Sequence, residues 1–132
     1  MIVVYTSIVG DLFHVGHLSL LHRAKELGDY LIVGVITDEA VEEYKRKPVI
    51  PTLERMEIIK AIKYVDEVIL QHSRDGTENL KKLDVNILVR GNDELLQDEV
   101  DYIQSSGGKF IQLGRTPGVS TTEIIKKIKQ KN

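Results

Sequence analysis

Two histidines, His14 and His17, lie near the N-terminus with Gly16 between them. They are three residues apart, a spacing that could place both in one site. Residues three apart lie on one face of a helix, so both imidazoles can point at the same ligand. A single histidine near a helix start is more often a cap or a core residue, and Gly16 alone would indicate a tight helix start. The pair together favours one shared ligand.

A second stretch that could bind a ligand is Arg115-Thr116-Pro117-Gly118-Val119-Ser120-Thr121-Thr122. Ser120 and Glu123 have the spacing of a capping box, and Pro117-Gly118 has that of a turn. A helix N-terminus also offers free N–H groups and a positive dipole to an anion. Here it gains three hydroxyls and the Arg115 guanidinium, which can form a bidentate fork with phosphate oxygens. We therefore expect helix capping and polyphosphate binding in the same segment.

Two further polar stretches allow a structural and a functional interpretation. Lys45-Arg46-Lys47, before Pro48, is either a solvated surface run or a basic lid over bound phosphates. Arg90-Gly91-Asn92-Asp93 is either a plain turn or part of a ligand crevice.

Alternating strands and helices are predicted to position all four stretches. Apolar runs predict strands at Ile2–Thr6, Tyr30–Ile36, Glu67–Leu70, Ile87–Val89 and Phe110–Leu113. Helical spacing predicts helices at Gly16–Leu27 with Gly28 as C-cap, Asp38–Tyr44, Leu53–Tyr64 with Thr52 as N-cap, Thr77–Leu83, Leu95–Ser105 and Thr121–Lys129. This order predicts an α/β fold, a Rossmann-like, doubly wound, parallel five-stranded sheet with helices on both faces. The four stretches then meet in the crevice at the carboxyl ends of the strands.

Composition excludes several function classes. The 132 residues suit one domain, 1–132, and 42% apolar with 29% charged residues is ordinary for a soluble protein. A net charge of −2 gives no sign of a nucleic-acid or membrane surface, and without cysteine there is no disulfide or thiolate chemistry. With no signal peptide or membrane span visible, we expect a cytoplasmic protein. No G-x-G-x-x-G follows the first strand, and no Walker A loop or Ser-His-Asp spacing is visible, so phosphoryl-group transfer by positioning and charge neutralisation fits best.

The motifs resemble one family. His14-Val15-Gly16-His17 matches the signature of the HxGH nucleotidyltransferase superfamily. The stretch from Arg115 to Thr122 resembles the R-T-x-G-[IV]-S-T-T motif of its small cytidylyltransferases, which make CDP-alcohols. Gly28–Val35 and Tyr64–Val68 are also similar to family segments, so the resemblance spans nearly the whole chain. Its length is similar to that of glycerol-3-phosphate cytidylyltransferases, whereas Gly91-Asn92-Asp93 is closer to the ethanolamine-phosphate enzymes.

The resemblance implies that CTP and a small phospho-alcohol give a CDP-alcohol and pyrophosphate, with Mg²⁺ held mainly by the triphosphate. It implies a homodimer and a catalytic set made of His14, His17, Lys45, Lys47 and Arg115. The implied nucleotide-binding residues are Ile8, Val9, Asp11, His14, His17, Gly91, Asn92, Asp93, Arg115, Thr116, Gly118, Val119, Ser120 and Thr121. The implied acceptor-binding residues are Asp11, Lys45, Arg46, Arg55 and Lys63.

Two departures from the family pattern bear on the acceptor. Ile8-Val9-Gly10-Asp11 replaces the usual Gly-x-Phe-Asp, and the basic loop is one residue shorter than K-G-K-K-P, which leaves the roles within Lys45-Arg46-Lys47 open. Two alternatives also stay open. One is an adenylyltransferase acting on a sugar phosphate or a flavin nucleotide, because Gly118–Ile128 is also similar to heptose-phosphate adenylyltransferases. The other is a nucleotide-binding module without catalysis.

Overall fold

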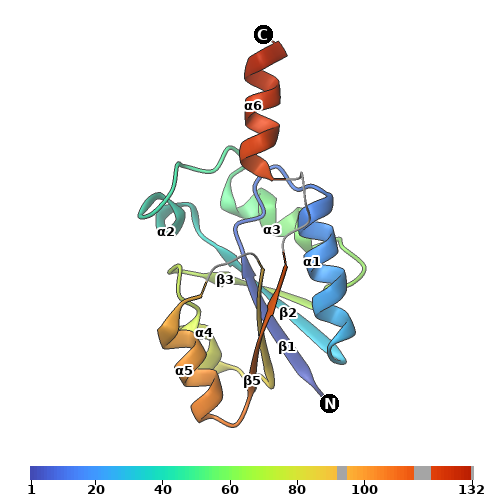
Figure 1. Cartoon of the computed structure of the whole chain (residues 1–132), viewed down its shortest axis with the longest axis vertical. Helices are drawn as coiled ribbons and strands as arrows, with labels where there is room; N and C mark the ends of the chain where they lie inside the picture. The colour runs from blue at the N-terminus through green and yellow to red at the C-terminus, as the bar shows by residue number, and fades with distance from the viewer. Residues whose placement is uncertain (92–94, 115–119, 132) are drawn as a thin grey trace.

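A five-stranded parallel sheet forms the centre of the computed structural model, which describes residues 1–91, 95–114 and 120–131. The strands are β1 (Val3–Ile8), β2 (Tyr30–Ile36), β3 (Glu67–Gln71), β4 (Ile87–Gly91) and β5 (Lys109–Leu113). Their order in the sheet is β3-β2-β1-β4-β5 (Figure 1). The strand order reverses at β1, which pairs with β2 on one side and β4 on the other. Ligands of open α/β sheets bind beyond the carboxyl ends of the strands at this point.

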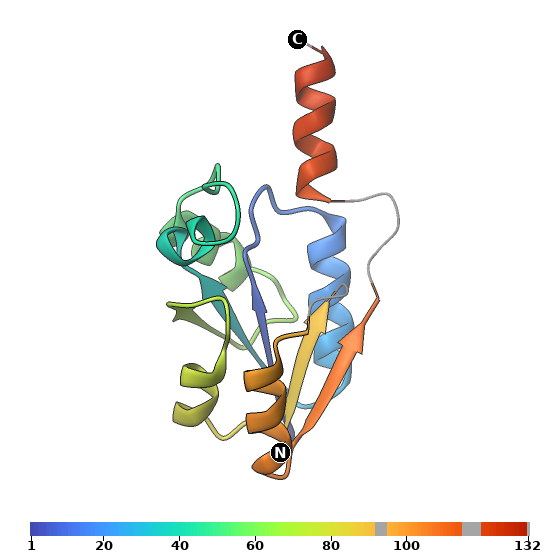
Figure 2. The same ribbon diagram turned by 60° about the vertical axis from the view of Figure 1, so that its left-hand side comes forward.

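Helices cover both faces of the sheet, as predicted. They are α1 (Val15–Glu26), α2 (Asp38–Glu42), α3 (Thr52–Lys60), α4 (Thr77–Lys82), α5 (Gln97–Ser105) and α6 (Thr121–Lys131). Helices α1 and α3 lie on one face and α4 and α5 on the other (Figures 1 and 2).

Alternation along the strands creates the two apolar cores. In β1, Val4 packs with Leu21 of α1 and Ile59 of α3. The next residue, Tyr5, packs with Leu80 of α4 on the other face. Successive side chains of a strand point to opposite faces, so a strand buried on both sides is apolar at nearly every position.

Helix α6 differs from the others because it extends away from the sheet (Figure 2). None of its residues is buried. Its first residue is attached to the body, since the Thr121 hydroxyl donates a hydrogen bond to the Asp11 carbonyl at 2.8 Å. The start of α6 therefore lies beside the loop that follows β1.

The predicted elements are all present, with corrections at their ends. The strands extend up to two residues further than predicted, β1 to Ile8 and β4 to Gly91. Four helices are shorter: α2 ends at Glu42, α3 at Lys60 and α4 at Lys82, and α5 begins at Gln97.

Two predicted helix caps are also corrected. Thr52 is not the N-cap of α3; Pro51 is, and the Thr52 hydroxyl instead accepts the Asp38 N–H at 2.9 Å. The C-cap of α1 is Leu27, one residue before Gly28. Gly28 is needed for close packing, because a Cβ there would lie 2.8 Å from the Ile2 carbonyl oxygen.

Candidate active site

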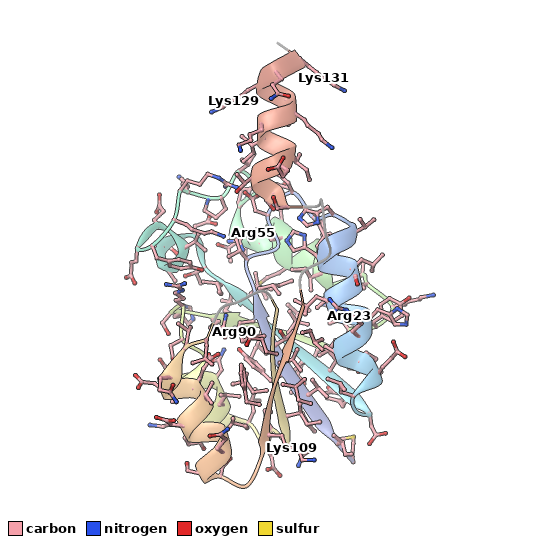
Figure 3. The ribbon with its side chains drawn as sticks, in the orientation of Figure 1. Arg23, Arg55, Arg90, Lys109, Lys129 and Lys131 are labelled. Carbon is pink, nitrogen blue, oxygen red and sulfur yellow. The ribbon has the colours of Figure 1, made fainter. Side chains whose placement is uncertain are left out.

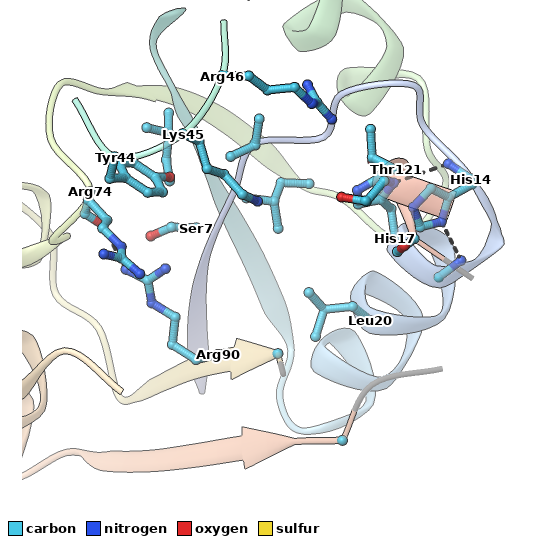
Figure 4. A pocket seen from close by; sticks show the side chains of 18 of the residues that line it. Ser7, His14, His17, Leu20, Tyr44, Lys45, Arg46, Arg74, Arg90 and Thr121 are labelled. Atoms are coloured by element: carbon cyan, nitrogen blue, oxygen red, sulfur yellow. Dashed lines mark hydrogen bonds between the residues drawn. The ribbon is translucent and has the colours of Figure 1, made fainter. Parts of the chain in front are cut away.

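A cavity of about 410 Å³ opens at the carboxyl ends of the strands, where the sequence predicts the crevice (Figure 4). Its walls come from the loop after β1, the first turns of α1, the loop after α2, the loop after β3, the ends of β4 and β5, and the start of α6. The described lining residues are Ser7, Ile8, Val9, His14, Gly16, His17, Leu20, Arg23, Ile36, Tyr44, Lys45, Arg46, Arg74, Arg90, Gly91, Gly114, Ser120, Thr121 and Thr122.

The two histidines are fixed by the backbone at the start of α1. His14 is the N-cap, and its Nδ1 accepts the Gly16 N–H at 3.0 Å. His17 completes a capping box, because its Nδ1 accepts the His14 N–H at 3.1 Å. A neutral imidazole that accepts at Nδ1 carries its proton on Nε2, so both rings line the cavity as Nε2–H donors.

Burial keeps both imidazoles neutral near pH 7. The pKa of His17 is lowered to about 4, chiefly by burial and to a smaller extent by the nearby His14 and Lys45, against an opposing contribution from Asp11. Burial also lowers the pKa of His14. The ring centroids lie only 3.9 Å apart, so two imidazoliums here would repel each other strongly. The pair is thus a preformed set of neutral hydrogen-bond donors.

These pKa shifts predict acid sensitivity. A histidine whose pKa is lower in the folded protein stabilises it fully above the unfolded value of 6.5, and that stability is lost as the pH falls towards 4. For His17 the full loss is about 3 kcal/mol, and His14 adds to it in the same direction.

We expect urea unfolding to give a markedly lower free energy of unfolding at pH 4.5 than at pH 7.5. His17→Gln should flatten this dependence, whereas His22→Gln, on the exposed side of the same helix, should not; equal pH slopes for wild type and His17→Gln would contradict the assignment.

The start of α6 brings hydroxyls to the same cavity. The Ser120 hydroxyl accepts the Glu123 N–H at 3.1 Å, which is the half of the predicted capping box that the structure shows. Ser120, Thr121 and Thr122 all line the cavity together with His14 and His17. An anion could therefore meet imidazole N–H groups, hydroxyls and a helix N-terminus at once.

Asp11 connects the histidine loop to the basic loop. Its carboxylate accepts the Val49 and Ile50 N–H groups, each at 2.9 Å, and pairs with Arg46 at 3.2 Å. Burial alone would raise the pKa of Asp11, but these hydrogen bonds lower it below its ordinary value. Asp11 is 3% exposed and does not line the cavity. Asp11 positions the loop that brings Lys45 and Arg46 to the cavity, and its predicted contact with substrate stays a prediction.

Comparison with known proteins shows the family to which the chain belongs. The model of the family described as cytidylyltransferase-like matches residues 11–127, which include both histidines, the basic loop and the start of α6. The chain belongs to the cytidylyltransferase-like family. An ethanolamine-phosphate cytidylyltransferase of Arabidopsis thaliana is 39% identical over 92% of the chain. The glycerol-3-phosphate cytidylyltransferase of Staphylococcus aureus is 39% identical over 86% of it.

Other similar proteins are not named as cytidylyltransferases. The bifunctional protein HldE of Citrifermentans bemidjiense is 35% identical over 96% of the chain. The crystal structure of a lipopolysaccharide core biosynthesis protein from Thermoplasma volcanium matches 88% of the chain and 97% of its own, with a TM-score of 0.75 and 27% identity. The chain spans 31% of the Arabidopsis protein, 27% of the HldE protein and 85% of the Staphylococcus enzyme.

Three residues that were predicted to contact the acceptor or a phosphate do not line the cavity. Arg55 has no exposed surface, and its five N–H donors bind the carbonyls of Val9, Ile36 and Ile50, the Asp38 carboxylate and the Thr52 hydroxyl. Lys63 follows α3 at the opposite end of the sheet, with its ammonium over the Tyr64 ring. Lys47 is exposed and does not line the cavity. Arg55 thus holds loops together, and Lys45 and Arg46 are the cations that the basic loop contributes.

Six predicted nucleotide-binding residues, Asn92, Asp93, Arg115, Thr116, Gly118 and Val119, lie outside the described residues. The remaining predicted positions, Ile8, Val9, Gly91, Ser120 and Thr121, line the cavity beside the histidines.

The sequence analysis did not identify three arginines as site residues, although all three line the cavity. Arg23 lies two turns after Gly16 on the same side of α1, and its guanidinium donates to the Gly114 carbonyl at 2.8 Å. Arg74 follows β3, and Arg90 lies in β4; the sequence analysis considered the Arg90–Asp93 stretch as a turn or part of a ligand crevice but did not count Arg90 as a site residue. All three could have been found by asking which cations follow a strand or share the histidine face.

Proposed function

We propose that the protein transfers the cytidylyl group of CTP to the phosphate of a small phospho-alcohol. The observation that carries this proposal is that His14, His17 and the start of α6 line one cavity, where N–H and O–H donors converge with cations. No carboxylate is among the described lining residues, so the cavity suits a polyanion. The named cytidylyltransferase relatives supply the nucleotide and the kind of acceptor.

The reaction balances as a direct in-line displacement. An oxygen of the acceptor phosphate attacks the α-phosphorus of CTP, the bond from that phosphorus to the bridging oxygen breaks, and pyrophosphate leaves with the electron pair. The Nε2–H groups of His14 and His17 donate to phosphate oxygens, and Lys45 offsets their negative charge. The Ser120 and Thr121 hydroxyls and the α6 N-terminus hold the departing pyrophosphate. No enzyme nucleophile is needed.

Magnesium enters this scheme with the nucleotide. Within the described part of the chain, no three His, Asp or Glu side chains are grouped as metal ligands. Because no carboxylate is among the described lining residues, a Mg²⁺ ion would be held by triphosphate oxygens and water rather than by a protein cage. Bound in that way, the ion would neutralise phosphate charge.

The proposal is tested by pyrophosphate release. The purified protein with Mg²⁺, one nucleotide at a time and a panel of phospho-alcohols should release pyrophosphate with CTP and form a CDP-alcohol visible by mass spectrometry. Turnover with ATP but not CTP would overturn cytidylyl transfer. Nucleotide binding without turnover of any acceptor would show a binding module instead.

A second candidate, adenylyl transfer to a sugar phosphate, is favoured by one observation. The sequence from Gly118 to Ile128 is similar to that of heptose-phosphate adenylyltransferases, and HldE and a lipopolysaccharide core protein are among the similar proteins. Thermal shifts separate the two candidates, because the better nucleotide stabilises the protein more at equal concentration.

A homodimer is proposed alongside the activity. Val15 and Leu18 of α1 are 62% and 36% exposed, which leaves apolar surface on this helix. Light scattering after size exclusion should give twice the chain mass of 14.9 kDa.

Among the described helices, none is long and apolar enough to cross a bilayer.

A further inference from the structure

A buried ion pair lies behind the wall of the cavity that faces the histidines. Arg90 is 2% exposed, and Glu99 has no exposed surface. The Arg90 Nε donates to one carboxylate oxygen of Glu99 at 2.6 Å, and its Nη2 donates to the other at 2.8 Å. Arg90 also lines the cavity, across from His14 and His17 (Figures 3 and 4). The pair therefore joins the end of β4, at the cavity, to the first turn of α5.

The loop after β3 is attached to the same pair. The Gly76 N–H donates to the Glu99 carboxylate at 2.8 Å. The Arg90 Nη2 donates to the Arg74 carbonyl at 2.8 Å, and the Asp75 carboxylate accepts the Glu99 N–H at 3.2 Å. These contacts hold the loop against β4 and α5, and the loop lines the cavity with Arg74. One carboxylate thus fixes two segments of the cavity wall.

Stability alone does not account for a buried ion pair at this place. Taking two charges out of water costs about as much free energy as their attraction returns, so apolar residues of similar volume are often equally stable. A bidentate contact between a guanidinium and a carboxylate does fix the orientation of both groups. Residues that must keep one geometry at a site need this kind of support from behind.

We propose that Glu99 is a positioning residue of the active site, which acts through Arg90 to hold the wall made by the end of β4 and the loop after β3. This role rests on the proposed function, because the substrates of cytidylyl transfer would bind against this wall. His14 and His17 are oriented by backbone N–H groups at the start of their own helix. A displaced wall should therefore weaken substrate binding more than it slows the chemical step.

The test is a double-mutant cycle on stability and on kcat/KM. Glu99→Gln keeps the shape of the side chain and an acceptor for the Gly76 N–H, but it removes the charge that orients Arg90. Combined with Arg90→Met, it leaves no charge at either position. We expect urea unfolding to show each single variant less stable than wild type. The double variant should be more stable than either of them, because neither charge is left buried without its partner.

Activity should not recover with stability. Where circular dichroism shows the variants folded, we expect Glu99→Gln to lower kcat/KM in pyrophosphate release with CTP by about 10-fold or more, because small displacements in a site are that costly. Most of the loss should lie in the KM of CTP or of the acceptor, and the larger change identifies the substrate at this wall. Adding Arg90→Met should lower kcat/KM by no more than about 3-fold further, because Glu99 acts through Arg90.

Asp101→Asn is the matched control. It makes the same change from carboxylate to amide on the exposed side of α5, and it should leave kcat, KM and stability near those of wild type. If Glu99→Gln does not fold, Glu99→Asp takes its place, since it keeps the charge but draws the carboxylate back by one methylene group. The same loss of kcat/KM is expected from it.

Each outcome decides one proposal. A folded Glu99 variant with the kcat/KM of wild type, or a double variant that recovers kcat/KM together with stability, would overturn the positioning role and leave cytidylyl transfer standing. Losses that simply add, or a loss confined to kcat, would overturn it as well. Absence of pyrophosphate release by the wild type with CTP and every acceptor would overturn the proposed function, and the role of Glu99 with it.

Discussion

Replacing His17 with alanine is expected to lower kcat by about 100- to 1,000-fold, the usual cost of removing one preorganised donor at a reacting oxyanion. The His17 ring is held by the His14 N–H, so it is oriented before substrate arrives. An Nε2–H group that is fixed beforehand stabilises charge as it develops on the phosphorus oxygens, without reorganisation. The KM for CTP should change less than kcat, because the contact strengthens in the transition state.

Steady-state pyrophosphate release measures this effect. The matched control is His22→Ala, on the same helix but with its ring against Tyr64 and outside the cavity. Circular dichroism should show both variants folded at pH 7.5. A His17→Ala enzyme that keeps more than a third of the wild-type kcat would contradict a role for His17 in the transition state.

Replacing Arg55 with alanine is expected to cost about 3–5 kcal/mol of folding free energy, the range for breaking a buried charged pair. The change would leave the Asp38 carboxylate without its guanidinium partner, which lies at 2.7 Å. It would also leave the buried carbonyl of Ile36 and the partly buried carbonyls of Val9 and Ile50 without that donor. Unsatisfied buried polar groups retain their full desolvation cost.

Urea unfolding followed by circular dichroism measures this loss. Lys60→Ala, at the exposed end of the same helix, is the control and should change the free energy of unfolding by less than about 0.5 kcal/mol. If Arg55→Ala were as stable as wild type and raised only the KM of the acceptor, the original prediction that Arg55 binds acceptor phosphate would be restored.

Local patterns in the sequence were enough to predict the fold. Continuous apolar runs such as Tyr30–Ile36 identify strands buried on both faces, and the structure has that strand at the predicted bounds. The spacing of His14 and His17 predicts a shared direction, and both rings line one cavity. These inferences succeed because the information lies within a few residues of the chain.

The sequence alone did not reveal contacts that depend on partners far apart in the chain. Arg55 has the sequence neighbourhood of a surface cation, and only the carbonyls of Val9 and Ile36, far apart in the chain, make it a buried anchor. Asp11 likewise needs the Val49 and Ile50 N–H groups to become a loop support. The backbone carbonyl of Arg74 accepts hydrogen bonds from Gln71 and Arg90, and no periodicity reveals that arrangement.

The central place of β1 has a consequence for how the protein is made. Strands β1, β2 and β3 come from the first 71 residues and could pair as the chain leaves the ribosome, while β4 and β5 are added later on the open edge of β1. Both histidines and the basic loop belong to the early half, whereas Arg90 and the α6 hydroxyls belong to the late half. A chain that has been synthesised only as far as β3 therefore has part of the cavity wall but lacks Arg90 and the α6 hydroxyls, so the cavity is complete only once α6 has been made.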